Sequence, residues 1–435
     1  MAKLRNILLI CLTATAVLQA KPVLQQSGLT GEAGHANIAF RGAWIATVAN
    51  IDWPSQEAVG NTEKQQEEMI FLLDSLHAIG INAIIFQVRP TADALYRSNY
   101  EPVSHWLTGK QGVWNSDDQM VNGKCQNSKC FDPLAWTINE AHKRHMEVHV
   151  WLNPYRVNLA KTDTSMISAD HIFRKHPEWF WEYNKQWYFD PGLDVTREWI
   201  CTIVQDIVSR YDIQAIHMDD YFYPYPAGKL QIPDAETFAK YPRGFTDIRD
   251  WRRNNVNLAI QAISSTIREC KDSIQFGISP FGVWRNASVD STGSATQAGI
   301  TNYDDLYADI RLWIRSGWID YVLPQLYWEI GKKVADYEIL AHWWANEVRG
   351  TNCKLYIGMA PYRLENANPK TPWGQGNEIS RQMRLNRTIP EISGECFYST
   401  RPLLRNPRHV CDSIKAVYSE SEKKDSAQDF TLPRE

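Results

Sequence analysis

Midway along the chain lies the stretch Ile216-His217-Met218-Asp219-Asp220-Tyr221-Phe222-Tyr223-Pro224, in which an apolar segment is followed by two carboxylates and a cluster of aromatic rings. The apolar start predicts a β-strand, so the polar residues lie where that strand ends. Neighbouring carboxylates can differ in pKa, which lets one act as an acid while the other stays ionised. Aromatic rings offer faces on which sugars stack. The stretch alone fits glycan chemistry and equally fits two structural aspartates that cap a helix or bind a loop.

Similar apolar runs occur on both sides of this stretch and alternate with amphipathic segments of helical period. The predicted strands are Trp44–Ala49, Ala83–Arg89, Glu147–Leu152, Ala215–Asp219, Gln275–Ser279, Tyr321–Leu326, Lys354–Ala360 and Glu395–Ser399. The predicted helices are Glu63–Ala78, Pro133–His145, Thr196–Arg210, Phe245–Glu269, Tyr303–Ser316, Val334–Val348, Glu378–Leu385 and Pro407–Tyr418. Strands that are each followed by a helix predict an α/β protein with a closed (β/α)8 TIM barrel. A doubly wound open sheet is disfavoured because no glycine-rich loop follows the first strand.

Bulk composition narrows the classes of function. The 435 residues are 44% hydrophobic, which supports a sizeable core. A formal net charge of -4 provides no basic field, so binding of nucleic acid is disfavoured. The chain is rich in large rings, with 18 Trp and 19 Tyr, and such rings either fill cores or line stacking clefts.

The first residues have the layout of a secretory signal peptide, because the basic segment Met1–Arg5 precedes the apolar run Ile7–Leu12 and small residues. The expected division is a signal peptide over 1–20, a catalytic domain over 40–419 and a polar tail over 420–435. The mature protein is expected to be periplasmic or secreted, with no membrane insertion. Lipid attachment at Cys11 is disfavoured because Ile10 stands where a small residue is required.

The eight cysteines have no metal-ligand spacing, and neither a metal nor a cofactor is predicted. Cys125 and Cys130 lie close together in a polar loop and are predicted to form a local disulfide in an oxidising compartment. Cys201, Cys270 and Cys411 lie on apolar helical faces and are predicted to be buried thiols.

In a barrel the C-terminal ends of the strands face one cleft, and the long connections Tyr96–Phe131 and Asn158–Asp190 are predicted to wall it. Polar groups that suit sugar hydroxyls and rings that suit C–H faces follow most of the predicted strands. The predicted substrate-binding residues are Gln87, Arg89, Asp93, Asn153, Tyr155, Arg156, Tyr223, Trp284, Gln325, Tyr327, Trp328 and Tyr362. The predicted catalytic residues are Asp219, Asp220 and Glu329. Each residue alone could be structural, and the set as a whole favours a glycan-binding cleft.

Cleavage of a glycosidic bond needs a proton donor and either a nucleophilic carboxylate or a substrate group that replaces it. In one mechanism an aspartate of the Asp219-Asp220 pair is the nucleophile and Glu329 is the acid/base, with carboxyls about 5 Å apart. In the other, an N-acetyl group of the substrate attacks while one aspartate orients it and the other donates the proton. The second is favoured, and both remain open. Because side chains alternate along a strand, the two aspartates point the same way only if the strand end is bent.

Six segments at the predicted strands and their ends are distinctive: Arg41-Gly42-Ala43-Trp44-Ile45-Ala46-Thr47-Val48, Phe86-Gln87-Val88-Arg89-Pro90, Trp151-Leu152-Asn153-Pro154-Tyr155-Arg156, Met218-Asp219-Asp220-Tyr221-Phe222-Tyr223-Pro224, Ser279-Pro280-Phe281-Gly282-Val283-Trp284-Arg285-Asn286 and Pro324-Gln325-Leu326-Tyr327-Trp328. Together they resemble the glycosyl-hydrolase-like family 10, formerly catalogued as a domain of unknown function. The resemblance extends from about Phe40 to Ser419. It implies a (β/α)8 glycosidase that is exported and, by likeness to a bacterial relative that acts at the division site, cleaves peptidoglycan strands stripped of their peptides.

The expected function is therefore an exported glycoside hydrolase that acts on an N-acetylated polysaccharide, with peptidoglycan glycan strands as the first candidate. One alternative is an inactive barrel that binds carbohydrate without cutting it. Another is a hydrolase of a dietary or host polysaccharide, which shares the chemistry and differs only in substrate.

Overall fold

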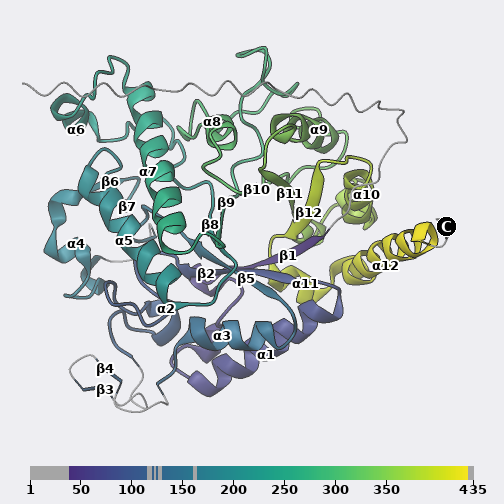
Figure 1. The fold of residues 1–435 in the computed structure, drawn as a ribbon, viewed down its shortest axis with the longest axis horizontal. Helices are drawn as coiled ribbons and strands as arrows, with labels where there is room; N and C mark the ends of the chain where they lie inside the picture. The colour runs from purple at the N-terminus through teal and green to yellow at the C-terminus, as the bar shows by residue number, and fades with distance from the viewer. Residues whose placement is uncertain (1–38, 115–119, 122–123, 126–129, 160–163, 430–435) are drawn as a thin grey trace, which may run out of the picture. The chain divides into compact units, whose positions relative to one another are not determined.

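The computed structural model describes residues 39–114, 120–121, 124–125, 130–159 and 164–429. All of them belong to one compact unit, His35–Glu435. Eight parallel strands close into a barrel in the order β1-β12-β11-β10-β9-β8-β5-β2. Their bounds are β1 Phe40–Ile45, β2 Ala83–Arg89, β5 Glu147–Leu152, β8 Ala215–Met218, β9 Gln275–Ile278, β10 Tyr321–Val322, β11 Lys354–Met359 and β12 Ile392–Phe397. Figure 1 shows β1, in purple, beside the yellow-green β12, the pairing that closes the barrel. The predicted (β/α)8 TIM barrel is confirmed.

Helices follow the barrel strands and pack around them (Figure 1). The main ones are α1 Thr62–Ala78, α3 Pro133–His142, α5 Asp194–Arg210, α7 Ile248–Cys270, α8 Ile310–Arg315, α9 Tyr337–Val348, α10 Glu378–Asn386 and α12 Val410–Asp429. The shorter ones are α2 His105–Thr108, α4 Ile172–Lys175, α6 Ala235–Lys240 and α11 Thr400–Arg405. Side-chain caps fix several starts, because the carboxylates of Asp132, Asp247 and Asp336 accept backbone N–H groups of the first turns of α3, α7 and α9.

Several predicted bounds were wrong. β1 begins four residues before the predicted strand and ends at Ile45, because the chain then turns through Ala49, which has a φ of 54°. β10 stops at Val322 because Pro324 follows and has no N–H for the ladder. Of the predicted helix Tyr303–Ser316 only α8 forms, and its start is fixed by the Asp309 carboxylate, which accepts the Leu312 N–H.

The predicted last helix, Pro407–Tyr418, is also different in the structure. A 3-10 turn covers Pro407–His409, with Arg408 at a φ of 54°, and α12 begins only at Val410. The helix continues to Asp429, into the segment 420–435 that was expected to be a polar tail. The predicted signal peptide over 1–20, with Cys11, lies outside the described residues.

Two apolar layers make up the core. The larger lies between the strands and the helices, and the smaller fills the barrel interior. In the interior, the rings of Phe40 and Tyr356 stack with centroids 4.2 Å apart. The fully buried His149, His217 and Tyr321 lie in the same interior.

The two long connections carry their own secondary structure. The first contains α2 and the two-residue strands β3 Met120–Val121 and β4 Lys124–Cys125, and the second contains α4 and a hairpin of β6 Phe180–Tyr183 and β7 Gln186–Phe189. Arg156, which follows β5, forms an isolated antiparallel β-bridge with Tyr188 of this hairpin through backbone hydrogen bonding. Within the part of the chain that is described, no helix has the length and apolar character needed to cross a bilayer.

Cys130 is disulfide-bonded. The side chain of its predicted partner Cys125 lies outside the described part, so the pairing of these two residues stays a prediction. Cys411 is buried and Cys201 half-buried, both as free thiols. The prediction for Cys270 was wrong: it is the last residue of α7 and is exposed, because the helix ends there in solvent.

Candidate active site

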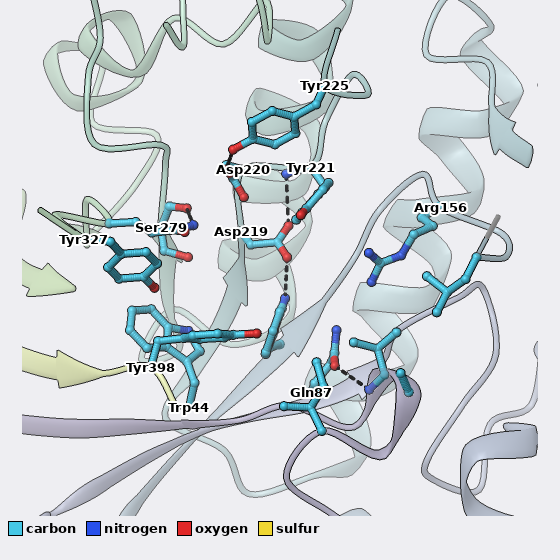
Figure 2. A pocket seen from close by; sticks show the side chains of 16 residues that line it. Trp44, Gln87, Arg156, Asp219, Asp220, Tyr221, Tyr225, Ser279, Tyr327 and Tyr398 are labelled. Atoms are coloured by element: carbon cyan, nitrogen blue, oxygen red, sulfur yellow. Dashed lines mark hydrogen bonds between the residues drawn. The ribbon is translucent and has the colours of Figure 1, made fainter. Parts of the chain in front are cut away.

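A cavity of about 400 Å³ opens at the C-terminal end of the barrel, and both adjacent aspartates line it (Figure 2). β8 ends at Met218, so Asp219 and Asp220 lie beyond the regular strand and its alternation no longer separates them. The cavity is lined by Trp44, Val48, Ala49, Ile51, Gln87, Trp151, Arg156, Leu159, Asp219, Asp220, Tyr221, Tyr225, Ser279, Gln325, Tyr327 and Tyr398.

Protein donors hold the Asp219 carboxylate in place. Its Oδ2 accepts hydrogen bonds from Asn153 Nδ2 at 2.6 Å and from Trp151 Nε1 at 3.2 Å. Its Oδ1 accepts the backbone N–H of Tyr221 at 3.1 Å. Burial raises the pKa of Asp219 above its ordinary value, and the charge of Arg156 and these donors offset part of that rise. The donors thus favour an ionised Asp219.

Behind Asp219, a second row of amides fixes its orientation. Gln87 Nε2 donates to Asn153 Oδ1 at 2.6 Å, which leaves the Asn153 amide group turned toward Asp219. Gln87 Oε1 in turn accepts the backbone N–H groups of Thr47 and Val48, each at 2.9 Å. The turn after β1, the end of β2 and the end of β5 therefore jointly set the position of this carboxylate.

Asp220 lies in a different environment. Burial and, next, the charge of Asp219 raise the pKa of Asp220 to about 7, although hydrogen bonds from Tyr225 and Gln325 lower it. The Tyr225 hydroxyl donates to Asp220 Oδ2, as Figure 2 shows. When two neighbouring carboxyl groups titrate as a pair, the first proton is lost more readily than the second, because the second carboxyl must ionise beside a negative charge. Since Asp219 has the stronger set of donors, the remaining proton stays on Asp220 near neutral pH.

Six of the predicted residues line the cavity together: Gln87, Arg156, Asp219, Asp220, Gln325 and Tyr327. Asn153 is buried behind Asp219, where it positions that carboxylate. Tyr362 lies one layer farther out, because its ring packs edge-on against Tyr327 and Tyr398, at centroid distances of 6.0 and 6.2 Å.

Other predicted binding residues are placed in structural roles. Arg89 is buried, pairs with Glu101 at 2.6 Å and donates to the Asn153 backbone oxygen at 2.6 Å, so it joins a loop to β5. Asp93 is buried and accepts from Thr91 and Gln111. None of these groups lines the cavity.

Four predicted aromatic residues likewise do not line the cavity. Tyr155 is 1% exposed and belongs to the core layer between strands and helices. The Tyr223 hydroxyl receives a hydrogen bond from Asn255, and Trp284 stacks on Trp343. Trp328 packs edge-on against Phe281. The position of an aromatic residue after a strand is therefore not enough to predict that its ring lines the cavity.

Glu329 is also separate from the cavity lining. Its carboxylate forms an ion pair with Lys332 at 3.0 Å and accepts the Trp373 Nε1–H at 2.8 Å. Burial raises the pKa of Glu329, but Lys332 and the other hydrogen-bond donors outweigh it and lower the pKa. A carboxylate that stays ionised and bound elsewhere is poorly suited to donate a proton in the cavity.

The sequence prediction missed Trp44, Trp151, Tyr221, Tyr225, Ser279 and Tyr398. Trp44 was placed at the start of a strand, whereas it lies near the C-terminal end of β1. Ser279 follows β9 directly, so its position at a strand end was the available signal. As for metal ions, no cluster of three or more His, Cys, Asp or Glu side chains suited to one occurs among the described residues.

The sequence matches the profile of a family described as "Glycosyl hydrolase-like 10" over residues 39–374. It is 46% identical over 382 residues to glycosyl hydrolase YngK of Bacillus subtilis (strain 168), which covers 87% of this chain and 72% of that protein. It is 39% identical over 377 residues to glycosyl hydrolase DigH of Escherichia coli (strain K12), with 82% of each chain covered. Among solved structures it is similar to α-L-fucosidase isoenzyme 2 from Paenibacillus thiaminolyticus, with a TM-score of 0.50, 11% identity, and coverage of 89% of this chain and 50% of that one. At that identity the likeness concerns the fold alone.

Proposed function

Because the chain belongs to the glycosyl hydrolase-like 10 family and is a glycoside hydrolase, we propose that it is exported and cleaves peptidoglycan glycan strands with the help of the substrate's own N-acetyl group. The observation that carries this proposal is the unequal environment of Asp219 and Asp220. Adjacent carboxylates with separated roles suit a mechanism in which the nucleophile comes from the substrate.

Asp219 is better suited to orient a group than to attack one. Three of its four lone-pair positions already accept hydrogen bonds, from Asn153, Trp151 and the Tyr221 backbone. The remaining position on Oδ1 can accept the N–H of an acetamido group. An ionised carboxylate there also stabilises the positive charge that develops on that group when its oxygen attacks.

The proposed reaction has two steps. The acetamido oxygen attacks C1 of the sugar, the bond from C1 to the glycosidic oxygen breaks, and Asp220 gives its proton to the departing oxygen. A water molecule then attacks C1, Asp220 takes a proton from that water, and the acetamido group is restored. Both displacements occur at C1, so the configuration there is retained.

The cavity wall offers an apolar surface for such a sugar. The ring of Trp44 lies edge-on to Tyr398 with centroids 5.9 Å apart, and Tyr327 stacks on Tyr398 at 6.0 Å. Figure 2 shows these rings beside the aspartates. Aromatic faces suit the C–H surface of a sugar and the methyl of an acetyl group.

Arg156 supports a peptidoglycan substrate. Among the described residues that line the cavity, Arg156 is the one with a cationic side chain. Its Nε donates a hydrogen bond to the Pro90 backbone oxygen. Its guanidinium lies 5.3 Å from the centre of the Tyr221 ring. Removal of a stem peptide leaves a carboxylate on the lactyl group of the glycan strand, and a guanidinium is well suited to bind one.

Incubation of the purified protein with peptide-free glycan strands tests the proposal, with product lengths followed by mass spectrometry. We expect shortening of these strands and much slower cleavage of strands from which the acetyl groups have been removed. Efficient cleavage of other N-acetylated polysaccharides, with peptidoglycan left intact, would assign the enzyme to a dietary or host glycan instead. Binding without shortening would favour the inactive barrel.

Substitution Arg156→Gln is expected to raise KM for peptide-free strands about 10- to 150-fold, because a charge-assisted hydrogen bond contributes about 1.5–3 kcal/mol. The KM for an oligosaccharide of N-acetylglucosamine, which has no carboxylate, should change much less. Steady-state kinetics on both substrates checks this, and an equal rise for the two would remove the lactyl carboxylate as the partner.

Substitution Glu329→Gln is expected to change kcat and KM less than about twofold, because the ion pair with Lys332 is partly exposed and such pairs contribute little. Initial rates on glycan strands provide the measurement. A loss of about a hundredfold or more would revive the mechanism in which this carboxylate is the acid/base.

Activity should fall as the pH rises through the pKa of Asp220, about 7, because the proton donor is then ionised. The Tyr225 hydrogen bond stabilises the carboxylate form of Asp220 and so lowers this pKa. Substitution Tyr225→Phe should therefore shift the alkaline limb of kcat/KM to higher pH. A shift to lower pH in the measured profile would show that Tyr225 stabilises the protonated form instead.

A further inference from the structure

A row of buried hydrogen-bonding side chains passes through the barrel interior from the cavity. His217 Nε2 lies 2.9 Å from Ser279 Oγ, and His217 Nδ1 lies 2.9 Å from Tyr321 Oη. Tyr321 Oη is also 2.9 Å from His149 Nδ1, and His149 Nε2 is 3.2 Å from Glu147 Oε2. Both histidines and Tyr321 are fully buried, whereas the Glu147 side chain, at the start of β5, is 50% exposed. The row therefore joins the cavity to solvent at the N-terminal end of the barrel.

The indole of Trp44 decides the direction of these hydrogen bonds at His217. An indole N–H can only donate, and Trp44 Nε1 donates to His217 Nε2 at 3.4 Å. Burial and the neighbouring His149 hold the pKa of His217 well below its usual value, so the ring is neutral. A neutral ring whose Nε2 accepts must have its proton on Nδ1. The second neighbour of Nε2, the Ser279 hydroxyl, is then also a donor.

The rest of the row follows in the same direction. His217 Nδ1–H donates to the Tyr321 oxygen, and the Tyr321 hydroxyl donates to His149 Nδ1. His149 Nε2–H then donates to the Glu147 carboxylate, a hydrogen bond that lowers the pKa of Glu147. In this arrangement Trp44 and Ser279 share the single lone pair of His217 Nε2, with Ser279 the closer donor, and each of the other polar hydrogens has an acceptor of its own.

We propose that this buried row fixes Ser279 as a hydrogen-bond acceptor in the cavity, so that Ser279 selects a sugar hydroxyl of the ring bound beside Asp220. The Ser279 hydrogen points inward to His217, and no described residue donates a hydrogen bond to Ser279 Oγ. Its lone pairs are therefore available to the ligand. The acetamido N–H is assigned to Asp219, which leaves a ring hydroxyl as the donor. This step rests on the proposed function.

Ser279 is thus a substrate-contact residue, while His217, Tyr321 and His149 are positioning residues that act through it. Loss of the Tyr321 hydroxyl would leave His217 Nδ1–H without an acceptor. His217 could then move its proton to Nε2 and donate to Ser279, which would turn the Ser279 hydrogen into the cavity. The ligand hydroxyl would face a donor in place of an acceptor.

The first test is spectroscopic and needs no substrate. In the full-length protein labelled with 15N at histidine, the signal of His217 is identified by its absence from His217→Gln. We expect a pyridine-type shift for Nε2 and a pyrrole-type shift for Nδ1 in the wild type, and a changed pattern in Tyr321→Phe. A pyrrole-type Nε2 in the wild type would overturn the inference.

The second test is kinetic. Ser279→Ala and Tyr321→Phe should each raise KM about tenfold with kcat changed less, the effect of one lost or inverted hydrogen bond. The matched control is Tyr337→Phe, because Tyr337 is also fully buried and its hydroxyl donates to Asn386 Oδ1 at 2.9 Å, away from the cavity lining. That control should lower the melting temperature as much as Tyr321→Phe does and leave KM unchanged. An unchanged KM in Ser279→Ala would overturn the inference. If the wild type cuts no glycan, the proposed function fails, and the 15N shifts still decide the state of His217.

Discussion

Asp220→Asn should lower kcat on glycan strands about 1,000-fold with little change in KM, because it removes the proton donor and leaves the contacts of the bound sugar in place. The side chain keeps its size, so Tyr225 can still donate to the amide oxygen. The loss should be much smaller on an aryl glycoside, since a phenolate leaving group needs little protonation. Comparison of the two substrates therefore separates loss of the acid from general damage to the site.

The matched control for this variant is Asp206→Asn. Asp206 is also buried and paired, with Arg210 at 2.8 Å and Asn99 at 2.7 Å, but it lies on α5 outside the cavity lining. Its substitution should lower the melting temperature and leave kcat on glycan strands unchanged. Should Asp220→Asn retain more than about a tenth of the wild-type kcat with an intact fold, Asp220 would not be the proton donor.

The barrel itself was predictable because its signal is repeated. Each of eight apolar runs was short and β-branched or aromatic, and each was followed by an amphipathic segment. Errors arose at the ends, where local chemistry overrides periodicity. Pro324 shortened β10, and the turn at Ala49 ended β1 early. Errors of a few residues in a strand end do not affect the fold prediction. They do change which side chains are expected in a site that lies at the strand ends.

The site was only partly predictable for the same reason. Asp219 and Asp220 could be identified because they follow an apolar run directly. Arg89 is the last residue of β2 and Tyr223 follows β8, yet Arg89 pairs with Glu101 and Tyr223 packs on Tyr307. Which neighbour a side chain meets depends on loops that are distant in sequence, and periodicity carries no information about them.

Tyr225 illustrates the remaining gap. It lies five residues after Asp220 in an irregular segment, and only the folded loop brings its hydroxyl to that carboxylate. The row from Glu147 to Ser279 is a clearer case, because its members come from three strands and the residue that follows β9. Barrel closure brings them together, so no linear pattern marks them.

Asp219→Asn should lower kcat about 100- to 1,000-fold, because the acetamido group loses the charge that stabilises it during attack. The substitution also turns an amide toward the donors of Asn153 and Trp151, which fit a carboxylate. If the acetamido group is the nucleophile, replacing the acetyl by a trifluoroacetyl group should slow the wild type strongly, since the oxygen becomes less nucleophilic. In Asp219→Asn the same replacement should slow cleavage by a smaller factor, because Asp219 no longer assists the attack of the acetamido oxygen.

The pH profile of Asp219→Asn provides an independent check. The negative charge of Asp219 is the second-largest cause of the raised pKa of Asp220. Removing that charge makes Asp220 easier to ionise, so the alkaline limb of kcat/KM should move to lower pH, opposite to the shift expected for Tyr225→Phe. If both variants moved the limb in the same direction, Asp220 would not be the group that the limb reports. Opposite shifts would identify Asp220 as the acid, because the charge of Asp219 raises the pKa of this carboxyl and the Tyr225 hydrogen bond lowers it.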